Sequence, residues 1–460
     1  MVKMTVSVNL PGNNGLEGQA SKWKAYKNIF AISLSFTFLF TSFQGVSNLQ
    51  SSINADENLG TESLTAVYVS LILSCLFLPS LVLKKLTCKW TMVVSVICYS
   101  TYIAAQFYPQ RYTLLPTAVL VGLGAAPLWS AKCTYLTQLG EYLNKYLGEA
   151  AEPLISRFFG IFFMFFQSSQ IFGNLISFLV LRPVTNEISL ENKTSLSKCG
   201  YDFCPADKAN NTNLVDIGSE KKNFLIGVYL AIALLSGVLL ASLVDSLGRY
   251  GEKERENNSR NQSPRALLIA TLSHLRNPYQ ILIVPLTVWS GLEQGFLVSD
   301  FTQAYVSCTI GVHNVGLVMI AFGAFDAIGS ISSGFVIKKV GRIPIFTLGA
   351  LLNVLAIIIL SYWEPTDSAT YVFFLIAAVW GLADSIWQTQ INSFYGVIFP
   401  NKAEAAFSNY RLWESLGFVI SFVLNGLACV YIKVYLISAV LALGMIGYFI
   451  IELLEWQKES

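Results

Sequence analysis

The stretch "FVIKKVGRIP" (residues 335–344) places a short basic turn between two apolar segments, and "LVLKKLTCKW" (residues 81–90) has the same layout. The first Lys-Lys pair follows the second apolar segment of the chain, and the second pair follows the eighth, 254 residues later. A weaker match at an offset of 258 aligns Trp129 in the fourth segment with Trp387 in the tenth. A repeat of this length predicts two halves built on the same plan.

The composition indicates that these segments lie in a membrane. The 460-residue chain is 54% hydrophobic and only 13% charged, whereas soluble domains carry about 25% charged residues. A helix needs about 20 apolar residues to cross the hydrocarbon, where backbone groups must be hydrogen-bonded within their own segment. About twelve segments qualify: 29–49, 64–83, 91–108, 112–132, 158–181, 224–246, 279–299, 313–337, 344–362, 370–395, 412–431 and 434–452. The expected fold class is therefore an all-α membrane protein.

The polar stretch 247–278 divides the predicted helices into two groups of six. We expect a tail over 1–28, a bundle over 29–246 with a long polar loop at 183–223, a linker over 247–278, a second bundle over 279–453 and a tail over 454–460. Two such parallel repeats are the plan of the major facilitator fold. Lys and Arg gather in alternate loops and are absent from the predicted loops 50–63, 300–312 and 363–369. We therefore expect both termini and the linker to be cytoplasmic.

The loop 183–223 contains five lysines, yet its other features indicate an extracellular position. Glycosylation sequons begin at Asn192 and Asn210. Cys199 and Cys204 also lie in this loop, and in an oxidising compartment they could form a disulfide with each other. The alternative is that both are free thiols.

Three carboxylates fall deep inside predicted spans: Glu293, Asp326 and Asp384. Each costs roughly 2.5–3.5 kcal/mol at the bilayer centre unless it has a partner or a water-lined cavity. In "WGLADSIWQTQINSFYG" (380–396), Asp384 is followed at four-residue intervals by Gln388 and Asn392, which places all three on one helix face. One interpretation is that these acids border a central cavity and bind a cation or a proton.

The alternative interpretation is that Asp384 pairs with Arg411, which lies with Glu414 at the cytoplasmic entrance of the eleventh span. Such a pair would close the cytoplasmic side, and the polar side chains at 388 and 392 fit either interpretation as interhelical hydrogen-bonding groups. Lys132, near the inner end of the fourth span, is expected to extend to the lipid headgroups. Asp245, at the end of the sixth span, is expected to be interfacial.

The sequence contains no pattern typical of catalysis, metal binding or cofactor binding. The only histidines, His274 and His313, lie far from the loop cysteines, so a zinc site would lack ligands. "GLGAA" (122–126) lies inside a span with no strand before it and is not expected to be a nucleotide-binding loop. The net charge of +2 comes without a basic patch for nucleic acid. We therefore expect no enzyme, no cofactor, no metal and no nucleic-acid partner, and a lipid bilayer around the chain.

The stretch "GFVIKKVGR" (334–342) resembles the facilitator loop motif G-x-x-x-D-R-x-G-R, with Gly334, Lys339, Gly341 and Arg342 in register. In transporters of that fold the loop helps to lock one conformation, and its basic side chains sit at a helix C-terminus, where the dipole favours cations. Here Lys338 replaces the acidic residue and the copy in the first half lacks the glycines. We therefore do not expect the usual charge-based lock.

Four longer motifs resemble the Unc-ninety-three (UNC-93) family: "GLGAAPLWSAKCTYLT" (122–137), "FFGIFFMFFQSSQIFGNLIS" (158–177), "WGLADSIWQTQINSFYGVIF" (380–399) and "EAAFSNYRLWESLGFVI" (404–420). The resemblance implies the facilitator fold and a non-enzymatic plasma-membrane protein that regulates or escorts an ion channel, such as a potassium channel, or a receptor. The alternative function is secondary transport of a small solute coupled to protons or cations.

Overall fold

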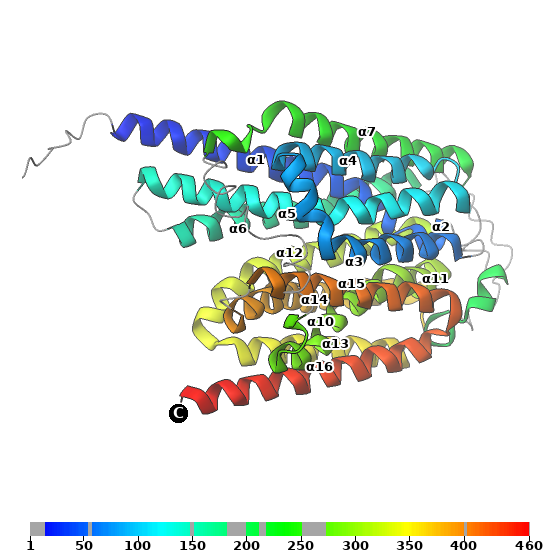
Figure 1. Ribbon diagram of the computed structural model, residues 1–460. Helices are drawn as coiled ribbons and strands as arrows, with labels where there is room; N and C mark the ends of the chain where they lie inside the picture. Colours follow the sequence, from blue (N-terminus) through cyan, green and yellow to red (C-terminus); the bar gives the residue numbers. More distant parts are fainter. Residues whose placement is uncertain are drawn as a thin grey trace, which may run out of the picture.

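The computed structural model describes residues 14–53, 58–147, 151–181, 199–210, 218–250, 273–399 and 403–459, and every regular element in these ranges is a helix (Figure 1). The first half contains α1 (Asn14–Ser47), α2 (Gln50–Ile53), α3 (Leu59–Lys85), α4 (Cys88–Ala105), α5 (Arg111–Leu147), α6 (Ala151–Leu181), η3 (Gly200–Asp202), η4 (Pro205–Asn210), α7 (Ser219–Leu243) and η6 (Leu247–Tyr250). The second contains α10 (Pro278–Phe296), η7 (Leu297–Ser307), α11 (Cys308–Ile310), η8 (Val312–Asn314), α12 (Val315–Val340), α13 (Arg342–Tyr362), η9 (Asp367–Ala369), α14 (Thr370–Ile398), α15 (Ala403–Leu427) and α16 (Val430–Glu459).

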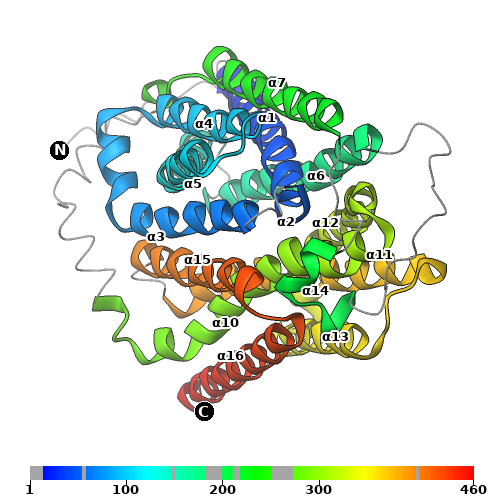
Figure 2. The ribbon, with the colours of Figure 1, turned by 90° about the vertical axis from the view of Figure 1, so that its right-hand side faces the viewer.

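The long helices pack as two bundles. In the first, α3 packs on α5 and α1 on both α6 and α7; in the second, α10 packs on α15 and α16, and α12 on α14. The bundles meet where α6 contacts α12 and α3 contacts α15, and Figure 2 shows them as two groups seen end-on. We call the end where α1 begins and α16 ends the terminal side, and the end with η3 and η4 the loop side (Figure 1).

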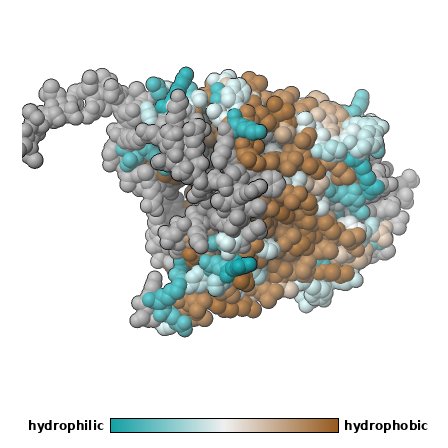
Figure 3. Space-filling model, viewed as in Figure 1, coloured by the Kyte–Doolittle hydropathy of each residue, from teal (hydrophilic) through white to brown (hydrophobic). Residues whose placement is uncertain are grey.

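An apolar band crosses both bundles on the face of the molecule seen in Figure 3. Eleven helical segments of the described chain are long and apolar enough to cross a membrane, and Figure 3 shows their hydrophobic surface between two more polar ends. The long helix α15 is not among the eleven, since it carries buried polar groups such as Asn409 and Glu414. The chain is therefore a multi-pass membrane protein, as its composition predicts.

Helices α10 and α15 approach each other backbone to backbone. A Cβ atom added to Gly291 would overlap the main-chain carbonyl of Glu414, and one added to Gly417 would overlap that of Val288. Glycine at these positions allows the close crossing that stabilises helix pairs in membranes, where there is no hydrophobic drive between helices. This crossing holds α15 in place at the interface with the first bundle.

Several predicted helix ends are wrong. Helix α1 begins at Asn14, well before residue 29, and α5 continues to Leu147, beyond residue 132. The largest error is the predicted loop 300–312, because α10 runs directly into the π-helix η7, which is buried along its length. The absence of Lys and Arg from this segment suggested an external loop, whereas it reflects burial inside the protein.

A polar contact joins α1 to the end of α7 on the terminal side. Lys27 Nζ lies 2.9 Å from Asp245 Oδ2, which also accepts hydrogen bonds from Asn28 Nδ2 (3.0 Å) and Tyr250 Oη (2.9 Å). Burial alone would raise the pKa of the Asp245 carboxyl, but these hydrogen bonds, together with the charge of Lys27, lower it to about 2. Asp245, just beyond α7, thus fastens the first helix of the bundle to the last.

Candidate functional site

Glu293, Asp326 and Asp384 come from α10, α12 and α14 and form one group, which we call the acidic cluster. Their exposed fractions are 0%, 2% and 3%. Glu293 and Asp326 both lie within electrostatic range of Asp384. The structure therefore places the three carboxylates singled out in the sequence side by side in the second bundle.

The hydrogen bonds given to Glu293 and Asp384 come from neutral side chains. Trp380 Nε1 donates to Glu293 Oε2, and Gln294 Nε2 donates to Asp384 Oδ1 at 2.8 Å. Glu293 Oε1 is buried and has no hydrogen-bond partner among the described residues. The cluster thus contains one carboxylate oxygen that is neither solvated nor hydrogen-bonded.

Asp326 connects the acidic cluster to the first bundle. Gln167 Nε2, on α6, donates to Asp326 Oδ2 at 2.7 Å, and Ser330 Oγ lies 3.5 Å from Oδ1. The α6–α12 contact is one of the two main helix contacts between the bundles. A change in the charge of Asp326 would therefore alter a hydrogen bond between the two bundles.

The polar stripe of α14 extends from the cluster toward the terminal side. Gln388 Nε2 donates to Ser290 Oγ on α10 at 3.0 Å, and Asn392 Nδ2 donates to Tyr410 Oη on α15 at 3.3 Å. Both amides therefore bond to neighbouring helices, which is the usual role of amide side chains between membrane helices. These hydrogen bonds connect α10, α14 and α15 on the terminal side of the acidic cluster.

Arg411 pairs with Glu414 and not with Asp384. The guanidinium Nη1 lies 2.6 Å from Glu414 Oε2, one turn along α15, and no ion pair links Arg411 to Asp384 in the part of the chain that the structure describes. The guanidinium carbon also lies 5.7 Å from the centre of the Trp129 ring on α5, in the other bundle. The predicted Asp384–Arg411 pair is wrong because Glu414 is nearer on the same helix.

Lys132 is buried in the first bundle, so its predicted extension to the headgroups is also wrong. Only 1% of it is exposed, and its ammonium group lies 4.9, 5.0, 4.3 and 4.9 Å from the ring centres of Trp129, Phe159, Phe162 and Phe163. Cation–π attraction stabilises a desolvated ammonium group in such a cage. The aromatic run of α6 was visible in the sequence, but its direction toward α5 was not.

The arginine of the facilitator-like loop motif is bound within its own bundle. Gly341 has a φ of 79°, which allows the sharp turn between α12 and α13. Arg342 Nε then lies 2.6 Å from Glu452 Oε1 on α16. Gly334 and Lys339 lie on the last turns of α12, where side chains are not described. Arg342 therefore joins α13 to α16 within the second bundle.

A buried ion pair on the loop side was missed in the sequence. Lys433 Nζ on α16 binds Asp300 Oδ1 on η7, and these residues are 4% and 1% exposed. Asn425 Nδ2 donates to the same oxygen at 2.8 Å. A lysine within the apolar run of α16 was itself a signal, since such a group requires an acidic partner inside the protein.

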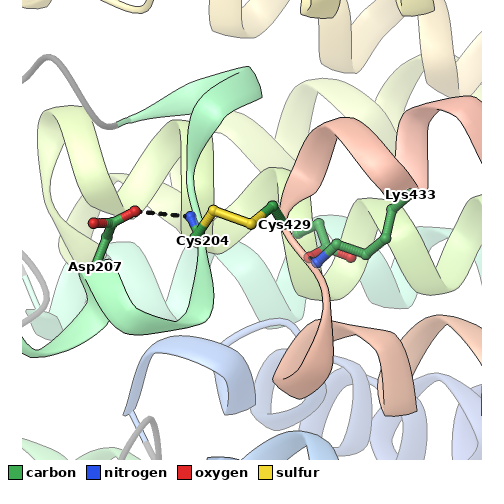
Figure 4. Close-up of a disulfide and its surroundings, with 5 residues drawn as sticks. Cys204, Asp207, Cys429 and Lys433 are labelled. Atoms are coloured by element: carbon green, nitrogen blue, oxygen red, sulfur yellow. Dashed lines mark hydrogen bonds and ion pairs between the residues drawn. A yellow bond between two sulfur atoms is a disulfide. The ribbon is translucent and has the colours of Figure 1, made fainter.

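The four loop-side cysteines form two disulfides, but not the predicted one. Cys199 is bonded to Cys308 and Cys204 to Cys429, so both bonds join the α6–α7 segment to the second bundle. Figure 4 shows the Cys204–Cys429 bond beside Lys433. The predicted Cys199–Cys204 pair is wrong because two cysteines outside this loop, Cys308 and Cys429, stand at the loop-side ends of η7 and α16 and bond to Cys199 and Cys204.

The remaining sequence predictions on this side lie where the structure says little. Asn192 falls outside the described residues, and Asn210 ends η4 with a side chain that is not described. No group of three or more His, Cys, Asp or Glu side chains in the described ranges could hold a metal ion.

Comparison with known proteins matches nearly the whole chain. The sequence profile of the family "Ion channel regulatory protein UNC-93" matches residues 51–449. The chain is 43% identical to protein unc-93 homolog A of Xenopus laevis and 39% identical to that of Homo sapiens, over 94% of each chain. It is 36% identical to the putative potassium channel regulatory protein unc-93 of Caenorhabditis elegans, over 94% of this chain and 61% of that protein.

Solved structures of similar fold are transporters. The nucleoside transporter NupG superposes with a TM-score of 0.62 at 15% identity, over 92% of this chain and 99% of that one. The xylose transporter XylE from E. coli, in a partially occluded inward-open conformation, superposes with a TM-score of 0.64 at 12% identity, over 93% and 99%. At these identities the likeness establishes the facilitator fold and nothing about substrate.

Proposed function

The chain belongs to the UNC-93 family of ion channel regulatory proteins, and from that premise we propose that it regulates a potassium channel in the plasma membrane without catalysing a reaction. The observation that carries this proposal is the family match, which runs through both bundles from residue 51 to residue 449. The relative in Caenorhabditis elegans, named as a putative potassium channel regulatory protein, supports the choice of partner.

We further propose that the loop side is extracellular and that both termini are cytoplasmic. Lys and Arg are frequent in the loops of the terminal side, which favours the cytoplasm. The two disulfides of the loop side need an oxidising compartment. In this orientation Asn192 and Asn210 are available for glycosylation.

The loop motif also favours regulation over transport. In the facilitator fold this loop locks one conformation, but Arg342 is engaged by Glu452 within the same bundle, and Lys338 stands where the motif has an acid. The charge lock of a typical transporter therefore lacks its usual acid, whereas the scaffold itself is intact. A protein that binds a partner through a stable scaffold does not need that lock.

Recording potassium currents tests the proposal. A potassium channel is expressed alone, with this chain, or with an unrelated facilitator protein at matched surface level, and channel and chain are then co-purified in mild detergent. We expect this chain, and not the unrelated protein, to alter the current and to co-purify with the channel. Unchanged currents and no co-purification across the potassium channel classes would contradict the proposal.

A second candidate function is transport coupled to protons or cations, which the acidic cluster favours because Asp326 contacts Gln167 across the boundary between the bundles. Reconstituted vesicles placed in solutions of solute mixtures test it. Transport predicts cation- or pH-dependent uptake that is lost in Asp384→Asn and kept in Asp367→Asn, an exposed loop-side control. No uptake of any solute class by the wild-type protein would reject this candidate.

A further inference from the structure

The unpartnered oxygen of Glu293 indicates what the acidic cluster binds. Glu293 Oε2 is occupied by Trp380, while Oε1 is buried without a hydrogen-bond partner among the described residues and the carboxyl group faces Asp384. Two ionised carboxylates in contact repel each other strongly where water is excluded. A single proton between them removes that repulsion and supplies Oε1 with a partner.

Among the described residues, no cation neutralises the acidic cluster. The donors to the three acids are the neutral side chains of Trp380, Gln294, Gln167 and Ser330. Glu414, on α15, interacts electrostatically with Asp384. Because Glu414 forms an ion pair with Arg411, the two together add no net charge to the acidic cluster. In the described parts of the neighbouring helices no Lys, Arg or His forms an ion pair with any of the three.

We propose that Glu293 and Asp384 share a bound proton, and that with Asp326 they form an intramembrane proton-binding site between α10, α12 and α14. Asp326 already has a hydrogen-bond donor at each oxygen, Gln167 at Oδ2 and Ser330 at Oδ1. The shared proton lowers the charge of the Glu293–Asp384 pair from −2 to −1. Neither regulation nor transport is required for this inference, because it concerns only the occupancy of the site.

The site is coupled to the contact between the bundles. Gln167 donates to Asp326 Oδ2 through its amide nitrogen, and a proton placed on that oxygen would turn the carboxyl into a donor to the amide oxygen instead. The hydrogen bond survives with its direction reversed. Movement of a proton between Asp384 and Asp326 therefore changes the polarity of the α6–α12 contact without breaking it.

Infrared spectroscopy of the full-length purified protein in nanodiscs tests the proposal. A protonated carboxyl group has a C=O stretching band that a carboxylate lacks, and the band shifts in D2O. We expect this band in the wild-type protein at pH 7, loss of one carboxyl equivalent in Glu293→Gln and in Asp384→Asn, and no change in Asp367→Asn. The amides keep the size of the acids, and gel filtration selects folded protein.

The outcomes are separable. A wild-type protein without a protonated-carboxyl band at pH 7 overturns the proposal even if neither variant folds. A band that persists undiminished in both variants places the proton elsewhere and also overturns it. Disappearance of the wild-type band on adding sodium or potassium salt would mean that the site holds a metal cation in place of the proton in salt, and this would overturn the proposal as well. Currents of a co-expressed potassium channel, measured separately, do not enter into any of these results.

Discussion

Cutting the chain in its central linker should leave the two halves covalently joined. Cys199 and Cys204 precede the linker, whereas their partners Cys308 and Cys429 follow it. With a protease site inserted in the linker, the cleaved protein should run as one species in SDS without reductant and as two fragments with reductant. This result depends only on which cysteines are bonded, not on any assumed function.

The size of the effect on stability follows from the loops that the disulfides close, which span 109 and 225 residues. In the chain-entropy treatment, cross-links over such distances stabilise by about 5 kcal/mol each. An unfolding entropy of about 2 cal/mol/K per residue gives roughly 1 kcal/mol/K for the chain, so each lost bond lowers Tm by about 5 °C. Helices that stay formed in the bilayer already restrict the unfolded chain, which makes the value of about 5 kcal/mol per bond an upper bound.

Matched serine variants complete the test. Replacing the pair Cys199 and Cys308, or the pair Cys204 and Cys429, should leave the cleaved halves joined by the other bond. Replacing all four should release them without reductant. Separation of the wild-type fragments without reductant would refute the assigned pairing and favour a bond within the α6–α7 segment.

Three further predictions concern packing and charge. Lys433→Ala leaves a buried aspartate without its cation, a loss of roughly 3–5 kcal/mol, so a Tm within 1 °C of wild type would contradict this role. Gly417→Ala overpacks the α10–α15 crossing by about 1–3 kcal/mol and should lower Tm and yield, whereas Gly160→Ala, whose added Cβ meets nothing within 4 Å, should do neither. The pKa of Asp245 is lowered from 3.8 to about 2, so its contact with Lys27 stabilises fully above about pH 4 and is lost as the pH falls toward 2. The Tm difference between wild type and Asp245→Asn should therefore be constant from pH 7 to 5 and shrink below pH 4; a difference that grows with acid would be inconsistent with this.

The fold could be predicted from the sequence because the bilayer leaves few options. Long apolar segments in hydrocarbon must be helices, and the repeated Lys-Lys turns at 84–85 and 338–339 indicated the two halves. The π-helix η7 could not be predicted in this way. It carries Asp300, Gln303 and several hydroxyl side chains, so its polarity resembles that of an external loop, and only its neighbours in the second bundle and in α2 make it an interior segment.

The acidic cluster was predictable in its members but not in its contacts. Glu293, Asp326 and Asp384 stand out because carboxylates are rare in apolar helices, whereas their donors Trp380 and Gln294 look like ordinary helix residues. The partner of Arg411 was mistaken for a similar reason. Sequence gives the depth of a charge along one helix, but the choice between two acids at similar depth depends on side-chain direction.

The comparison of the two halves indicates which of these charges the scaffold needs. In the proposed repeat the position of Asp384 corresponds to Ala126, which is buried at 5% exposure in the first bundle. A methyl group is therefore sufficient for packing at this place in the fold, whereas a carboxylate here carries the insertion cost of a charged group and needs the hydrogen bond from Gln294. The first bundle shows the opposite deviation, since Lys132 holds a cation among aromatic rings. Each half thus departs from the common plan with a buried charge of opposite sign. The features that the two halves share determine the fold, whereas these two charges serve the function of the protein. By this reasoning Asp384 serves the function and not the fold, which agrees with its proposed role as a proton-binding group.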